Sequence, residues 1–258
     1  MGFTFDGTAS RSMGIATRMA SENRVPELKN RTIEIPGRDG LLDLGSSFSE
    51  RVIEISCLVP PKRTQADFLD CKDRIVRWLS PDKGLCELEL DTEPGRVYYA
   101  RLRDGVAFER IAVLAATFDL TFFCPDPFGY AVEDEVFSIG ETGSYTVTRV
   151  KGNIESNPVY RLKASLSSGT NRSVIISTNG TELKITNAVL AASEVLVIDS
   201  AKMTAWVEDE HGNTLRNALP YIADLNFPVL NAGNNTISIT ASNAAFTELE
   251  IQAKSRWR

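Results

Sequence analysis

Regular alternation of apolar side chains is the feature of this sequence that most limits its fold. From Ala112 to Cys124 every second residue is apolar, and Thr and Asp residues occupy much of the opposite phase. Successive side chains of a β-strand point to opposite faces, so the pattern predicts a strand with one buried face. Residues 51–59 and 86–90 alternate in the same way, and residues 96–103 follow the second of these segments across a Pro-Gly turn. The first half therefore predicts a largely antiparallel sheet.

One segment of the first half, residues 64–80, has a helical period instead. Phe68, Ile75 and Leu79 recur at the spacing of an amphipathic helix, with Cys, Trp and Val residues widening the apolar stripe. Thr64 is a suitable N-terminal cap, and a Ser-Pro pair ends the segment. We expect one helix, inserted in the chain between strands and packed on them through its apolar stripe.

The length of 258 residues and an apolar fraction of 43% favour two globular domains. We expect a β-rich domain over residues 1–130 and a second domain over 156–258, joined by a junction at 131–155 where alternation is weak. The second half is rich in Asn, Ser and Thr and has no apolar helical stripe, which favours a β-sandwich. Its predicted strands, separated in several places by turn signals such as Asn-Gly, are 160–166, 173–177, 183–185, 195–198, 204–207, 236–239 and 247–252.

The charge balance argues against a nucleic-acid-binding or membrane protein. With 28 basic and 34 acidic residues the net charge is −6, and neither half has a basic excess. The first 20 residues contain charges and no continuous apolar run, and no later run reaches the roughly 18 apolar residues of a membrane span. We therefore expect a soluble chain made in the cytoplasm, without specific nucleic-acid binding.

The residue types that support catalysis or metal binding are scarce. The single histidine, His211, lies in a polar run typical of a hairpin tip. The four cysteines lack the Cys-x-x-Cys spacing of zinc or redox sites, and three of them fall in phase with apolar strand residues, which indicates buried thiols. Glu87 and Glu89 could form a glycosidase pair, although carboxylates opposite an apolar strand face are typical of a solvated surface. We therefore predict no catalytic residue, no cofactor and no metal site.

Two loop segments suggest contacts with other subunits. The loop Pro36–Gly40 (PGRDG) places an Arg-Asp pair between glycines but lacks the spacing of a phosphate-binding loop. It is better explained as a packing loop, within the chain or against another subunit. The segment Cys124–Tyr130 (CPDPFGY) ends a strand and carries Phe128 and Tyr130, two of the aromatic residues of the first half. Most of these aromatic residues should lie in the core, and contacts between subunits could use the remainder, because aromatic residues are enriched where protein surfaces meet.

The order of these features resembles the distal tail proteins of long-tailed bacteriophages (siphophages). The resemblance covers nearly the whole chain and is firmer in the first half. In the first half it rests on FTFDGTAS at Phe3–Ser10, on Met13-Gly14-Ile15, on PGRDG, on the strand and helix that follow, and on CPDPFGY. The second half resembles the family's galectin-like sandwich, through Asn157-Pro158, Ile185-Thr186-Asn187, Leu196 to Asp199 and Asn231 to Asn235.

The resemblance implies a mainly β structural protein with a galectin-like C-terminal β-sandwich and no enzymatic activity. It implies a homo-hexameric ring at the tip of the virion tail, assembled in the host cytoplasm, that joins the tail tube protein to the tail-tip hub protein and to a fibre or receptor-binding protein. We expect Arg38, Asp39, Phe128 and Tyr130 to contribute to contacts between subunits of that ring. The alternative hypotheses are a carbohydrate-binding or adhesion module, with 156–258 as the binding part, and a glycan hydrolase.

Overall fold

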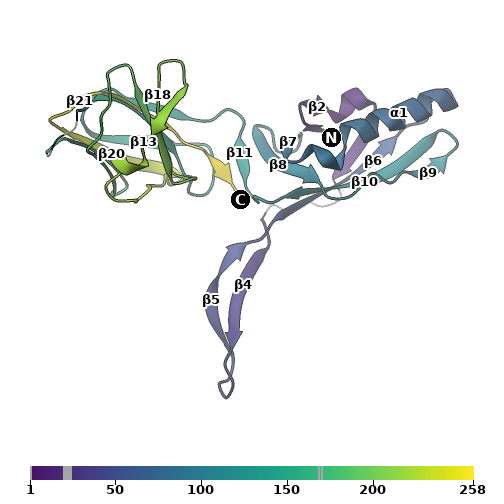
Figure 1. The fold of residues 1–258 in the computed structure, drawn as a ribbon. Helices are drawn as coiled ribbons and strands as arrows, with labels where there is room; N and C mark the ends of the chain where they lie inside the picture. The colour runs from purple at the N-terminus through teal and green to yellow at the C-terminus, as the bar shows by residue number, and fades with distance from the viewer. Residues whose placement is uncertain (1, 20–24, 168, 170) are drawn as a thin grey trace. The chain divides into compact units, whose positions relative to one another are not determined.

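The computed structural model describes residues 2–19, 25–167, 169 and 171–258, which form two compact units. The first unit runs to Val132 and the second spans Glu133–Trp257. The protein is mainly β throughout, as the sequence predicts (Figure 1). None of the helices in this described part of the chain has the length and apolarity needed to cross a membrane.

An antiparallel sheet forms the body of the first unit. Its strands follow the order β2-β1-β7-β8-β10-β6-β3, with β9 paired to β10 and β11 paired to β8. A two-stranded hairpin, β4–β5, is the other strand pair of this unit. The bounds are β1 Phe3–Phe5, β2 Thr8–Ala9, β3 Ala16–Met19, β4 Leu28–Glu34, β5 Leu41–Phe48, β6 Arg51–Val59, β7 Cys86–Leu90, β8 Arg96–Leu102, β9 Glu109–Ala112, β10 Ala115–Cys124 and β11 Gly129–Ala131.

The predicted helix is present as α1, Gln65–Trp78. The Thr64 side chain caps it by accepting a 3.1 Å hydrogen bond from the backbone N–H of Asp67. The buried side of α1 consists of the apolar residues predicted to face the sheet, except that Val76 is exposed. The Trp78 indole N–H donates to the Phe5 carbonyl at 2.9 Å, which ties the end of the helix to β1. Short 3₁₀ turns lie at η1 Ser10–Met13, η2 Pro81–Lys83 and, in the second unit, η3 Leu219–Tyr221.

The core of the first unit lies between α1 and the alternating faces of β6 and β10. The rings of Phe3 and Phe5 pack against Phe122 with centroids 5.6 and 5.1 Å apart. β10 is shorter than the continuous strand predicted from Ala112. A turn at residues 113–114 reverses the chain between β9 and β10, so Ala112 is exposed in β9 rather than part of the buried face of β10.

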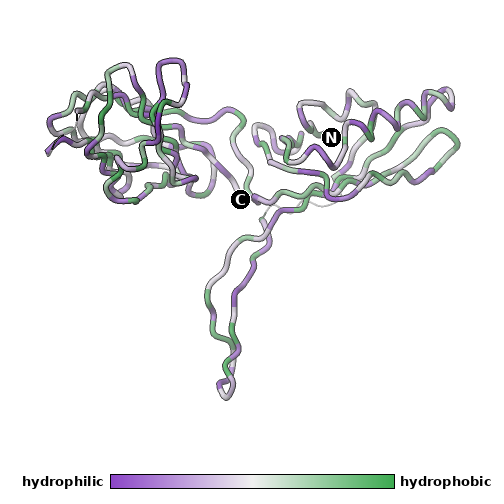
Figure 2. Tube along the Cα trace, viewed as in Figure 1, coloured by the Kyte–Doolittle hydropathy of each residue, from purple (hydrophilic) through white to green (hydrophobic). Residues whose placement is uncertain are grey.

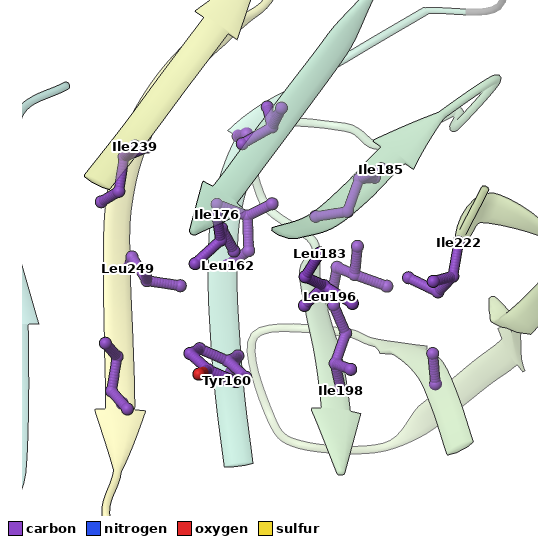
Figure 3. Packing of buried hydrophobic residues seen from close by; sticks show 14 of the residues in the cluster. Tyr160, Leu162, Ile176, Leu183, Ile185, Leu196, Ile198, Ile222, Ile239 and Leu249 are labelled. Carbon is purple, nitrogen blue, oxygen red and sulfur yellow. The ribbon is translucent and has the colours of Figure 1, made fainter. Parts of the chain in front are cut away.

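The second unit is a sandwich of two antiparallel sheets, as predicted. One has the strand order β12-β21-β14-β17-β18-β19 and the other the order β13-β20-β15-β16. Figure 3 shows Leu, Ile and Tyr side chains from both sheets filling the space between them. The bounds are β12 Val136–Ile139, β13 Gly143–Arg149, β14 Val159–Ser165, β15 Ser173–Thr178, β16 Thr181–Thr186, β17 Val195–Asp199, β18 Thr204–Glu208, β19 Thr214–Asn217, β20 Gly233–Ser242 and β21 Ala245–Gln252, with β22 Arg256–Trp257 near the chain end.

The segment 131–155, expected as a junction, differs from the prediction. It contains β12, which pairs with β21, and β13, which pairs with β20 along its full length. Both strands are therefore part of the sandwich. Tyr145 and Val147 of β13 pack against the core and the Ser and Thr residues between them are exposed, but only two apolar residues share the inward face before Arg149, so the sequence signal is weak.

Candidate functional site: an exposed apolar hairpin

The hairpin β4–β5 is the most unusual surface of the first unit. Every residue from 27 to 47 is exposed, and no other strand in the described chain pairs with either of its strands. An isolated two-stranded hairpin is only marginally stable in water, because it has no sheet or helix to pack against. A hairpin of this kind is therefore expected to be completed by contacts outside its own unit.

The hairpin is rich in large apolar side chains although it buries none of them. Figure 2 shows apolar segments along both of its strands. Ile33 and Leu42 are directly opposite each other across the two strands, so their side chains share one face. Exposed apolar side chains gathered on one element favour a protein–protein contact. The exposed apolar side chains are Leu28, Ile33, Ile35, Leu41, Leu42 and Leu44.

Arg38 and Asp39 lie at the tip of the hairpin, within the PGRDG segment. The backbone N–H of Arg38 donates to the Ile35 carbonyl at 3.1 Å, which closes the turn. Gly37 and Gly40 have φ of 81° and 83°, a conformation that glycine adopts without strain. Both charged side chains are exposed, and neither makes an ion pair with another described residue. A partner could therefore bind either charge at the tip.

Phe128 lies at the opposite end, where the hairpin joins the sheet. Its ring meets the ring of Phe48 edge-on, with centroids 5.8 Å apart. The neighbouring Arg51 is buried, donates from Nε to the Pro127 carbonyl at 2.7 Å and stacks on the Tyr98 ring. These contacts hold the base of the hairpin on the body of the first unit.

Tyr130, in β11, is also occupied within the chain. Its hydroxyl donates to an Asp126 carboxylate oxygen at 2.5 Å, and its ring lies 5.8 Å from the ring of Tyr99. The preceding position, Gly129, has no room for a side chain, because a Cβ there would lie 3.0 Å from the Tyr98 ring. The structure therefore does not bring the four predicted residues together. Strand β5, which connects the tip to the base, spans roughly 23 Å from Leu41 to Phe48.

The structure describes few groups suited to catalysis. His211 is exposed at the β18–β19 turn, as predicted. Burial raises the pKa of the Cys57 and Cys124 thiols to about 12, which disfavours the nucleophilic thiolate. Among the described residues no group of three or more His, Cys, Asp or Glu side chains could hold a metal ion.

The sequence reasoning missed most of this surface. It singled out the tip loop but not strand β5, because residues 41–48 do not alternate. The available signal was the group of leucines at 41, 42 and 44, which follows a turn and precedes the alternating strand β6.

Comparison with known proteins identifies the class of this fold. Residues 14–124 match the family described as "Phage tail protein RIFT-related domain". This match covers most of the first unit, including the whole of the hairpin, and leaves out β1, β2 and β11. The first half of the chain is therefore similar to phage tail protein domains. No curated protein matches the sequence.

The fold of the whole chain is similar to that of one particular solved protein, phage SPP1 Dit (gp 19.1), described as a paradigm of the hub adsorption apparatus in phages that infect Gram-positive bacteria. The TM-score is 0.75 at 17% sequence identity, and the similarity covers 100% of this chain and 99% of that one. The phage p2 baseplate is less similar, with a TM-score of 0.47 at 11% identity over 93% of this chain and 91% of that one. The family match over residues 14–124, together with the fold shared with SPP1 Dit, confirms the predicted resemblance to siphophage distal tail proteins.

Proposed function

We propose that this protein is a structural component of a siphophage tail tip and that its copies form a ring through the hairpin β4–β5. The single observation that carries the proposal is the hairpin itself, with six large apolar side chains exposed and none covered by the described residues of its own unit. A second copy of the same chain is the simplest partner. Repetition of one contact around a closed ring covers every hairpin without leaving a free one.

The expected contact belongs to the obligate class. Obligate interfaces bury roughly 2,000 Å² or more and are more apolar than transient ones. The hairpin offers both of its faces and both of its strand edges, so a neighbouring copy can enclose it. Arg38 and Asp39 would then fix the register of the tip, because opposite charges side by side discriminate between docking positions.

The proposed ring is a homo-hexamer in the virion tail tip, assembled in the host cytoplasm and without enzymatic activity. In this proposal the first unit lies between the tail tube protein and the tail-tip hub protein, and the sandwich unit provides the attachment for a fibre or receptor-binding protein. Phe128 and Tyr130 would act indirectly, since they hold the base of the hairpin or the adjacent strand rather than contacting a neighbour.

The experiment that tests this proposal is a measurement of molar mass by light scattering over a range of protein concentrations. We expect a discrete assembly of six 28.4 kDa chains that persists on dilution. A single chain at every concentration, in the presence and absence of the tail-tip hub protein, would contradict the proposal.

A further inference from the structure

A polar hollow in the second unit is not explained by ring formation. It lies on the outer face of the four-stranded sheet and has a volume of about 680 Å³, within the range of roughly 300–1,000 Å³ typical of ligand sites. Ser173 of β15 is opposite both Thr186 of β16 and Ser242 of β20, so three hydroxyl side chains form a row across three strands. They face outward, because the adjacent Val174 and Ile185 point into the core.

Two cations line this hollow without a compensating charge. Neither Arg172 nor Lys184 makes an ion pair or a side-chain hydrogen bond with another described residue, and the described lining contains no carboxylate. The other sheet of the sandwich differs, because Arg161, Lys163 and Arg216 each lie against a glutamate. Unpaired cations that share a concave surface favour an anionic ligand.

Three asparagines provide the remaining polar wall. Asn171, Asn187 and Asn243 adopt φ of 73°, 54° and 49°, conformations that asparagine tolerates better than most residues. The Asn243 amide donates to the Asn171 carbonyl at 3.0 Å and so fixes two of the surrounding loops to each other. Amide and hydroxyl groups can both donate and accept hydrogen bonds, which suits a ligand with many hydroxyls.

We propose that this hollow binds an anionic glycan, meaning a polymer whose sugar units carry a phosphate or a carboxylate. Arg172 and Lys184 bind the anionic group, while the row of hydroxyls and the asparagine amides bind the sugar hydroxyls. A guanidinium binds phosphate and carboxylate alike, and both give charge-assisted hydrogen bonds.

Two carboxylates lie close in sequence to residues that line the hollow, and they allow a further prediction. Glu182 precedes Lys184 by two residues on the same outward face of β16, and Asp224 follows Ala223 of the lining, but neither carboxylate lines the hollow. Each opposes the binding of an anion over a short distance. Glu182→Gln should therefore strengthen binding, and weaker binding by this variant would contradict the charge assignment.

The experiment measures binding of the full chain to immobilised polysaccharides by biolayer interferometry. The probes are a phosphate-bearing polysaccharide, polygalacturonate as the carboxylate-bearing polymer, and dextran as the neutral one. We expect one or both acidic polymers to bind and dextran not to bind. Binding of only one identifies the anion, whereas binding of neither, or equal binding of dextran, would overturn the proposal.

Matched charge variants distinguish binding in the hollow from non-specific electrostatic attraction between the chain and an acidic polymer. Arg172→Gln combined with Lys184→Gln should weaken binding at least about tenfold, because two charge-assisted contacts are lost. Lys202→Gln combined with Lys254→Gln removes the same charge from exposed positions outside the hollow and should change binding less than about twofold. Equal losses in the two double variants would overturn the assignment. Light scattering on the same samples reports ring formation separately, so failure of one proposal is distinguishable from failure of the other.

Discussion

The paired substitution Ile33→Ser and Leu42→Ser tests whether the hairpin carries the contact between copies. These side chains are opposite each other and remain 48% and 37% exposed in the single chain. Fully burying a large apolar side chain contributes about 1.5–3 kcal/mol, so covering the exposed fractions of both contributes about 1.3–2.6 kcal/mol per contact. At about 1.4 kcal/mol per tenfold, the double variant should weaken each contact roughly 10- to 70-fold.

The assay is sedimentation equilibrium on the wild type and the variant at matched concentrations. Both positions are exposed in the single chain, so its free energy of unfolding should change by less than about 0.5 kcal/mol per residue. Leu225→Ser, at an apolar position of the sandwich unit that is 65% exposed, is the control and should leave association unchanged. Unchanged association of the double variant, or an equal loss in the control, would refute the role given to the hairpin.

Three further predictions concern the hairpin tip, the helix and an ion pair. Arg38→Ala and Asp39→Ala should weaken ring formation in light scattering while leaving thermal unfolding of the single chain unchanged; intact rings in both variants would remove the tip from the contact. Thr64→Ala removes the helix cap and should cost about 1 kcal/mol in urea unfolding, whereas Thr64→Ser should cost much less; equal losses would exclude the cap as the cause. Hydrogen bonds from Arg216 lower the pKa of Glu194 from 4.5 to about 2, so the pair stabilises the fold above pH 4.5 and this stabilisation is lost as the pH falls toward 2. Glu194→Gln should therefore lose stability less steeply than the wild type over that pH range in urea unfolding, and parallel curves would contradict the pairing.

The fold was predictable where one face of an element is buried. Period-two segments became β6, β7 and β10, and the helical stripe became α1, because the core accepts only the apolar phase of each. The sequence did not predict strands that have no buried face, because nothing then requires their apolar residues to alternate. Residues 41–48 have no core side at all, so no alternation reveals β5. Ala112 is apolar and in phase with β10, yet it is exposed in β9, because a turn separates the two strands.

The candidate sites were less predictable than the fold. The sequence indicates the tip residues Arg38 and Asp39 through their glycine-flanked loop, but the exposure of the whole hairpin depends on what the rest of the first unit leaves uncovered. The ring of Phe128 packs on Phe48 of the same chain, a contact that no sequence pattern specifies, and its role between copies stays a prediction. The hollow near Arg172 depends on register between three strands, which no local pattern specifies.

A cryo-electron microscopy reconstruction of the assembled ring tests the central claim most directly. It should contain six copies, with β4 and β5 of each copy enclosed by a neighbour and their apolar side chains buried. A ring whose hairpins project into solvent, with copies joined through other surfaces, would contradict it.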